Sequence, residues 1–221
     1  MKKIVNFILM VVFACSFLAV QSGCEESSWL LPYVSELKKD IYVGDSQEFN
    51  LKAYYGYKES PYASDGKIES HPYTLTFLLL DAEESQTTYF LTIPCMNDCR
   101  LEFTKNNTGK LVSSVEIEDF NQNSFDVKLQ FSSQNIDIKM HSIVPENCLD
   151  IDSVLKKIQA EQSNLINNYV LDSKFDAEIY ARVIVKDDKA YWYVAFASKD
   201  GLKAFLVDGV SGEVLAIREV F

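Results

Sequence analysis

The sequence predicts a fold that is mainly β plus α+β: an N-terminal antiparallel β-sandwich followed by a C-terminal helix packed on an antiparallel meander. Three observations support this prediction. Residues 40–146 consist of short runs in which apolar and polar side chains alternate, separated by turn-forming residues. Residues 151–169 have the period of an amphipathic helix. Alternating runs then return from Tyr180 to Val220, joined by turn signals.

The chain begins with a segment that is typical of exported proteins. Lys2 and Lys3 precede an apolar run from Ile4 to Val20, and small polar residues follow it. This run is shorter than the roughly 20 apolar residues that cross a bilayer. Residues 1–23 are therefore predicted to be an export signal.

The end of this segment, Ser22-Gly23-Cys24, resembles the lipobox of bacterial lipoproteins, although Gln21 stands where that family usually has leucine. The resemblance implies that residues 1–23 are a lipoprotein signal peptide and that Cys24 receives a lipid. The mature protein would then be attached to a membrane of the cell envelope, on its extracytoplasmic side. Glu25-Glu26 also resembles the acidic tag that directs lipoproteins of some Bacteroidota to the cell surface. An ordinary cleaved signal peptide and an uncleaved anchor are the alternatives.

The charge of the mature chain excludes some partners. Removal of Lys2 and Lys3 with the signal reduces the 21 Lys and Arg residues to 19, against 32 Asp and Glu residues, for a net charge of −13. Such a chain repels nucleic acid and anionic lipid. We therefore expect no nucleic-acid partner, and membrane attachment that depends on the lipid.

The polar segment over residues 24–39 is predicted to be a tether, and the sandwich over residues 40–146 follows it directly. Tyr42-Val43-Gly44-Asp45 and the alternating apolar residues after it resemble the turn and second strand of an immunoglobulin-like domain. About seven or eight short strands at this spacing fit two packed sheets. We expect the sandwich to lie near the membrane and the C-terminal domain to lie at the free end.

A long insertion over residues 56–71 carries tyrosines and is flanked by others. Tyrosines on a loop supply rigid, amphipathic contact area of the kind that binding sites favour. The candidate binding surface consists of four residues: Tyr54, Tyr57, Tyr62 and Tyr73. The alternative is that these side chains pack on strand faces, as tyrosines in β-rich proteins commonly do.

Three cysteines remain after Cys15 and Cys24 are set aside: Cys95, Cys99 and Cys148. An odd number in an exported protein allows one disulfide at most within the chain. The candidate pair is Cys95 with Cys99, and a bond from either of them to Cys148, or buried thiols, are the alternatives. The spacing is not that of a thioredoxin-like or zinc motif, so no redox or metal site is predicted here.

The second domain, residues 147–221, begins with the amphipathic helix, for which Asp150 or Asp152 is the candidate N-cap. The meander that follows carries Trp192, Val194 and Phe196 at alternate positions, and we expect these side chains to face the helix.

Trp192-Tyr193-Val194, together with the stretch from Val207-Asp208-Gly209 to Glu213-Val214-Leu215, resembles the PepSY type of module. The likeness covers about one third of the chain. Modules of that family occur in propeptides and surface proteins, where they are thought to bind or restrain peptidases, and they carry no catalytic residues. The resemblance therefore implies a peptidase as a candidate partner.

The sequence lacks the common catalytic and nucleotide-binding motifs: the nucleophile elbow, the phosphate-binding glycine loop, the zinc-protease helix and the calcium loop. We expect no enzymatic activity, no cofactor and no metal site. The alternative is a small hydrolase or metal-dependent enzyme in which His71 or His141 meets a carboxylate or Cys148 in a deep pocket.

Together these features predict a lipid-anchored binding or interaction protein without catalytic activity of its own. Its partner would be a protein or peptide, bound through sheet edges, the tyrosine surface or both. Two further alternatives are a modulator or inhibitor of an extracellular peptidase, and a component of a cell-envelope or conjugation apparatus.

Overall fold

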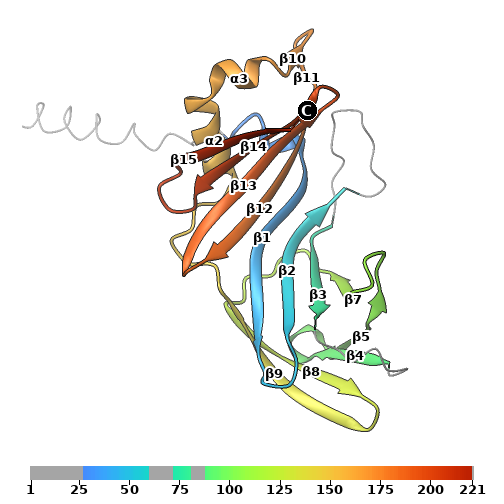
Figure 1. Ribbon diagram of the computed structural model, residues 1–221. Helices are drawn as coiled ribbons and strands as arrows, with labels where there is room; N and C mark the ends of the chain where they lie inside the picture. Colours follow the sequence, from blue (N-terminus) through green and yellow to red (C-terminus); the bar gives the residue numbers. More distant parts are fainter. Residues whose placement is uncertain (1–26, 60–71, 81–87, 221) are drawn as a thin grey trace, which may run out of the picture.

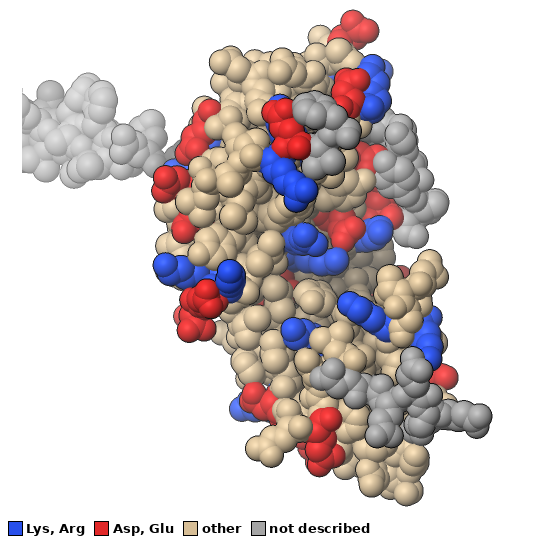
Figure 2. All heavy atoms as spheres, viewed as in Figure 1, with Lys and Arg blue, Asp and Glu red and all other residues tan. Residues whose placement is uncertain are grey.

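The computed structural model describes residues 27–59, 72–80 and 88–220 (Figure 1). This part of the chain is mostly antiparallel β with few helices, as the mainly β prediction requires. Cys24, Tyr62 and His71 lie outside the described residues. The molecule is elongated: α2, α3 and the C-terminal strands lie at one end, and β4, β5, β8 and β9 lie at the other (Figures 1 and 2).

The N-terminal half is a sheet that folds back on itself at β1. Its strands are β1 (Val34–Asp45), β2 (Leu51–Lys58), β3 (Thr74–Leu79), β4 (Tyr89–Ile93), β5 (Cys99–Glu102), β6 (Thr104–Lys105), β7 (Leu111–Glu116), β8 (Ser124–Phe131) and β9 (Gln134–Ser142), with the 3-10 turns η1 (Leu31–Tyr33) and η2 (Pro94–Met96). Strand β1 pairs antiparallel with β2, and its last four residues also pair with β9. The strand order on one side is therefore β2-β3-β7-β6, while β9, β8, β4 and β5 continue on the other.

One apolar core fills the space that this folded sheet encloses. Strands of both sides contribute to it, because the inward positions alternate with outward polar ones along each strand. Its largest fully buried side chains include Tyr42, Tyr55 and Phe77.

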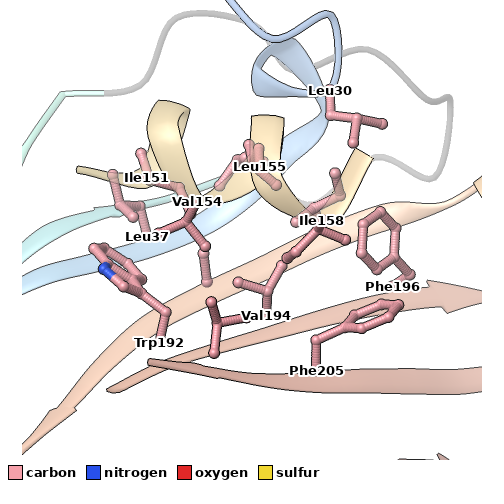
Figure 3. Packing of buried hydrophobic residues seen from close by; sticks show 14 of the residues in the cluster. Leu30, Leu37, Ile151, Val154, Leu155, Ile158, Trp192, Val194, Phe196 and Phe205 are labelled. Carbon is pink, nitrogen blue, oxygen red and sulfur yellow. The ribbon is translucent and has the colours of Figure 1, made fainter. Parts of the chain in front are cut away.

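The C-terminal half places helices on one face of an antiparallel meander. Its elements are α2 (Ile151–Glu161), α3 (Ser163–Asn167), β10 (Val170–Leu171), β11 (Lys174–Phe175), β12 (Glu178–Lys186), β13 (Lys189–Ser198), β14 (Gly201–Asp208) and β15 (Val214–Val220). Helix α2 begins after Asp150, whose carboxylate accepts a hydrogen bond from Ser153 N at 2.7 Å. Trp192, Val194 and Phe196 point toward the buried face of α2 (Figure 3).

The tether predicted over residues 24–39 is wrong for residues 28–39, which belong to the folded protein. Leu30, Val34 and Leu37 are buried in the C-terminal core, and the first part of β1 pairs in parallel with β12. The sequence pattern does not reveal this strand, because a 3-10 turn and a bulge between Val34 and Glu36 interrupt the alternation of apolar and polar residues. The two predicted domains are therefore joined by one strand that serves both cores.

Candidate functional site

A hollow of about 490 Å³ lies where the linker from β9 to α2 passes between the two cores. We call it the junction groove. Its lining combines side chains from β1 and β13 with the linker and includes Lys39, Asp40, Tyr73, Val144, Cys148 and Trp192. Aromatic, aliphatic and charged groups that converge on one concave site are typical of binding pockets.

The linker is held in place by hydrogen bonds from the meander. Trp192 Nε1 donates to the Leu149 carbonyl at 2.9 Å, and Leu149 N donates to the Gly209 carbonyl at 2.7 Å. Gly209 N in turn donates to the Ala190 carbonyl at 2.9 Å, and a Cβ at position 209 would lie 2.6 Å from that oxygen. The Asp208-Gly209 turn therefore fixes one wall of the junction groove, and a side chain at 209 would disrupt it.

The carboxylate of Asp40 is committed to structural hydrogen bonds. Its Oδ1 accepts from Ser142 Oγ at 2.6 Å and from Ile41 N at 2.8 Å, and its Oδ2 accepts from the Tyr42 hydroxyl at 2.8 Å. Burial, reinforced by the charge of Asp40, raises the pKa of Tyr42. The bond from Ser142 joins β1 to β9, and the three bonds together leave the carboxylate poorly placed to act as a general base.

Lys39 supplies positive charge to the groove. It is the extra residue at the bulge where the pairing of β1 with β2 shifts. Its Nζ lies 4.8 Å from the ring centroid of Tyr55 and 5.0 Å from that of Tyr73, which are cation–π distances. No ion pair engages Lys39 within the described part of the chain. Its charge is therefore open to a ligand on the groove side.

The thiol of Cys148 faces the same groove but is not activated. Burial raises the pKa of Cys148 above its ordinary value, so the group remains a neutral thiol at pH 7. Its Sγ lies 3.7 Å from the Leu149 carbonyl, the geometry of a weak donor. A neutral, half-buried thiol is a poor nucleophile and a poor metal ligand.

The predicted disulfide between Cys95 and Cys99 is absent, since both residues and Cys148 carry free thiols. Strand pairing places Cys99 opposite Ile93, two residues before Cys95. Cys95 itself lies in the 3-10 turn beyond the pair and is exposed. The hairpin register therefore offsets the two residues, which the short sequence spacing does not reveal.

The predicted tyrosine surface is not one surface. Tyr57 and Tyr73 lie edge to face with ring centroids 5.1 Å apart, and both pack against the C-terminal core. Tyr54 lies on the opposite face of β2, because side chains alternate along a strand, and its ring is 5.9 Å from Lys38 Nζ. Burial, with a smaller effect of Tyr73, raises the pKa of Tyr57. Of the described members, Tyr73 is the one that lines the junction groove.

The sequence provided weak signals for the rest of the groove. The sequence pattern places Lys39 in a tether and Trp192 in the core, and the linker residues have no periodic pattern. Pro145 and Cys148 do mark the linker, but nothing local indicates that it crosses beside β1. The groove exists because residues about 150 positions apart meet there.

The hydrolase or metalloenzyme alternative involves His141, which lies away from the junction groove. His141 Nδ1 lies 3.3 Å from Asp45 Oδ1, both side chains are exposed, and His141 does not line the groove. Within residues 27–59, 72–80 and 88–220, no group of three His, Cys, Asp or Glu side chains is placed to hold a metal ion. In the same ranges no helix is long and apolar enough to span a membrane.

Comparison of the chain with protein-family models, with curated proteins and with solved structures finds no match.

Proposed function

We propose that this chain is an extracytoplasmic binding protein that is anchored to a membrane by a lipid on Cys24, takes up a protein or peptide partner and catalyses no reaction of its own. The observation that carries the proposal is the chemistry of the junction groove. The groove offers aromatic and aliphatic contact area with one open cation, Lys39. The Asp40 carboxylate and the Cys148 thiol, in contrast, are unsuited to catalysis.

A short peptide segment suits the size and lining of this site. A volume of about 490 Å³ accommodates a few side chains. Tyr73, which is half-buried, supplies aromatic surface of the kind that anchors partner side chains in protein interfaces, whereas Trp192 is buried and only borders the groove. Lys39 would pair with a carboxylate of the partner.

The anchor rests on the sequence of the first 24 residues. A mature charge of −13 gives no electrostatic attraction to an anionic bilayer, so the membrane attachment that we propose comes from the lipid. On the face drawn in Figure 2, basic side chains are scattered among acidic ones.

We also propose a fold family for each half of the chain. A helix across an antiparallel meander with an Asp-Gly turn supports placing residues 147–221 with PepSY-like modules. The parallel strand that β1 adds to this meander is a departure from that pattern. Two sheet layers around one core support an immunoglobulin-like sandwich over residues 40–146, although β1 runs on beyond it.

The experiment is capture of partners from the native envelope with the full lipidated chain, tagged at its C-terminus. Asn123 is an exposed residue at the rim of the groove, and Asn123→Trp would fill it. Asn107→Trp, at an exposed turn outside the groove lining, is the matched control. We expect the wild type and Asn107→Trp to capture the same partner and Asn123→Trp to lose it.

Assay of the captured partner separates the alternatives. A peptidase whose activity falls when the protein is added would make the chain a peptidase modulator. Envelope or transport components without such inhibition would make it an assembly lipoprotein. Equal capture by Asn123→Trp and the wild type would refute the groove as the binding site, and substrate turnover by the purified protein would refute the absence of catalysis.

A further inference from the structure

Three large apolar side chains are exposed at the end of the molecule where the chain enters the fold. Trp29 is 41% exposed, and Val170 and Leu171 in the β10–β11 hairpin are 37% and 47% exposed. We call these three residues the apolar tip. Exposed apolar side chains that cluster at one end of a molecule are candidates for contact with a partner surface.

A buried phenylalanine, Phe175, joins Trp29 to the β10–β11 hairpin that carries the other two members of the apolar tip. The Trp29 ring packs edge to face on Phe175, with centroids 5.4 Å apart. Phe175 is paired with Val170 across the β10–β11 hairpin, and Leu171 is the next residue. Tyr33 also contacts Phe175, at 4.8 Å between centroids, so the tip has a rigid aromatic base.

The start of the chain is fastened directly beside this tip. Ser28 N donates to Asp152 Oδ1 at 2.7 Å, and Ser28 Oγ donates to Gln159 Oε1 at 3.2 Å, so residue 28 is attached to α2 at two points. Four residue steps separate Ser28 from Cys24. Even a fully extended chain covers at most about 14 Å over that distance.

We propose that the apolar tip docks on the lipid bilayer that holds Cys24, with the indole of Trp29 among the headgroups. This inference rests on the lipid anchor of the proposed function. Because the link is so short, a lipid on Cys24 keeps α2 and the tip within reach of the membrane surface. Tryptophan is the side chain that favours this interface, since its ring is apolar and its N–H is polar.

The contact is shallow and does not depend on attraction between charges. Asp172, Lys174 and Asp176 flank the apolar residues in sequence and are exposed, so they limit insertion to the headgroup region. The acidic mature chain would be repelled by anionic lipid. A zwitterionic surface, such as phosphatidylcholine or phosphatidylethanolamine, is the partner that fits both the apolar residues and the charge.

Docking in this way sets the orientation of the whole molecule. The C-terminal unit lies against the membrane, and the β8–β9 hairpin at the opposite end points away from it (Figure 1). This is the reverse of the order expected from a tether followed by the sandwich. The junction groove then lies between the membrane and the far end, open to partners outside the bilayer.

Fluorescence tests the inference, because the two tryptophans differ. Trp192 is 2% exposed and its indole N–H is bonded to Leu149, whereas Trp29 is open to a quencher. The full lipidated chain is placed in phosphatidylcholine vesicles with or without bromine on the acyl chains. We expect brominated lipid to quench part of the emission of the wild type and none of the emission of Trp29→Phe.

Two further variants locate the contact. Leu171→Asp introduces a charge into the apolar tip and is expected to reduce the quenching of Trp29. Val210→Asp is the matched control, since Val210 is also 47% exposed but lies in the β14–β15 turn. It is expected to leave quenching unchanged, and thermal unfolding of both variants checks that they are folded.

The outcomes test the lipid anchor and the docking of the apolar tip separately. Failure of the lipidated wild type to float with vesicles would refute the anchor, and the docking with it. Flotation without quenching of Trp29 would leave the anchor intact and refute the docking. Equal loss of quenching in folded Leu171→Asp and Val210→Asp would also refute the assignment to the tip.

Discussion

At the scale of single residues, Gly56 sets how closely β1 and β2 approach. A Cβ at this position would lie 1.8 Å from the Leu37 carbonyl oxygen, so no side chain fits without separating the strands. The contact lies next to the bulge at Lys39, which turns that lysine toward Tyr55 and Tyr73. The lack of a side chain at Gly56 thus permits the close strand approach beside the bulge that carries Lys39, the open cation of the junction groove.

Gly56→Ala is expected to lower the free energy of unfolding by about 3 kcal/mol, because the β1–β2 pairing must open to admit the methyl group. Gly109→Ala is the control: Gly109 has a φ of +78° and nothing within 4 Å of a new Cβ. Only its backbone conformation is unfavourable for alanine, at a cost of about 1 kcal/mol. Urea unfolding measures both, and equal losses would show that the close approach is unimportant.

At the scale of elements, helix α2 is both a wall of the core and the attachment point of the chain start. Val154, Leu155 and Ile158 are fully buried on one face. On its first turn, Asp152 accepts hydrogen bonds from Ser28 N and, at 2.9 Å, from Lys156 Nζ. The Asp152 carboxylate is therefore one of two groups on α2, with the Gln159 amide, that hold the chain start beside the apolar tip.

The attachment of Ser28 is expected to weaken in acid. Burial alone would raise the pKa of Asp152, but the hydrogen bonds from Lys156 and Ser28 and the charge of Lys156 outweigh it and lower the pKa. A group whose pKa is lower in the folded state adds stability above its unfolded pKa and loses it as the pH falls through the folded pKa. The stabilisation by Asp152 is thus present at neutral pH and disappears below the usual aspartate range.

Asp152→Asn isolates this effect. The variant should melt at a lower temperature than the wild type at about pH 7, and the difference should shrink toward zero at about pH 2. Asp187→Asn, in the exposed β12–β13 turn, is the control and should show no such convergence. A difference in melting temperature that stays constant with pH would contradict the role given to Asp152.

At the scale of the whole molecule, β1 makes the two halves interdependent. Its first residues pair in parallel with β12, and its last residues pair with β9 in the other half. Leu30, Val34 and Leu37 enter the core of the C-terminal unit although they precede it by more than 100 residues. The C-terminal meander is therefore incomplete without the chain start.

Residues 147–221 alone are expected not to form a stable fold. Loss of the three buried side chains removes about 6 kcal/mol of apolar burial, comparable with the total stability of about 5–15 kcal/mol of a typical domain. The fragment also exposes the edge of β12 that pairs with β1. Residues 28–221, the control, should show native near-ultraviolet circular dichroism. A native signal and cooperative unfolding from 147–221 would contradict the prediction.

Local patterns in the sequence were sufficient for the elements whose pairing is between neighbours. The helix that starts at Ile151, its Asp150 cap and the successive strands from β12 to β15 all follow from periods and turn residues within short windows. Strand alternation alone also predicts that Tyr54 and Tyr57 point to opposite faces of β2, since the two residues are three positions apart. The errors at the tether and at Cys95 and Cys99 arose where a bulge or a hairpin offset interrupts the local pattern.

The sequence by itself therefore determined that this protein is mainly β, acidic, equipped with an export signal pattern and poor in catalytic motifs. Only the tertiary structure decided that residues 28–38 complete the C-terminal core, that Lys39, Tyr73 and Trp192 share a groove, and that Trp29 lies beside the β10–β11 hairpin. The physical reason is that side-chain periods report which face of an element is buried but not which distant element covers it. Parallel pairing of β1 with β12 depends on contacts across some 145 residues, and no local pattern records them.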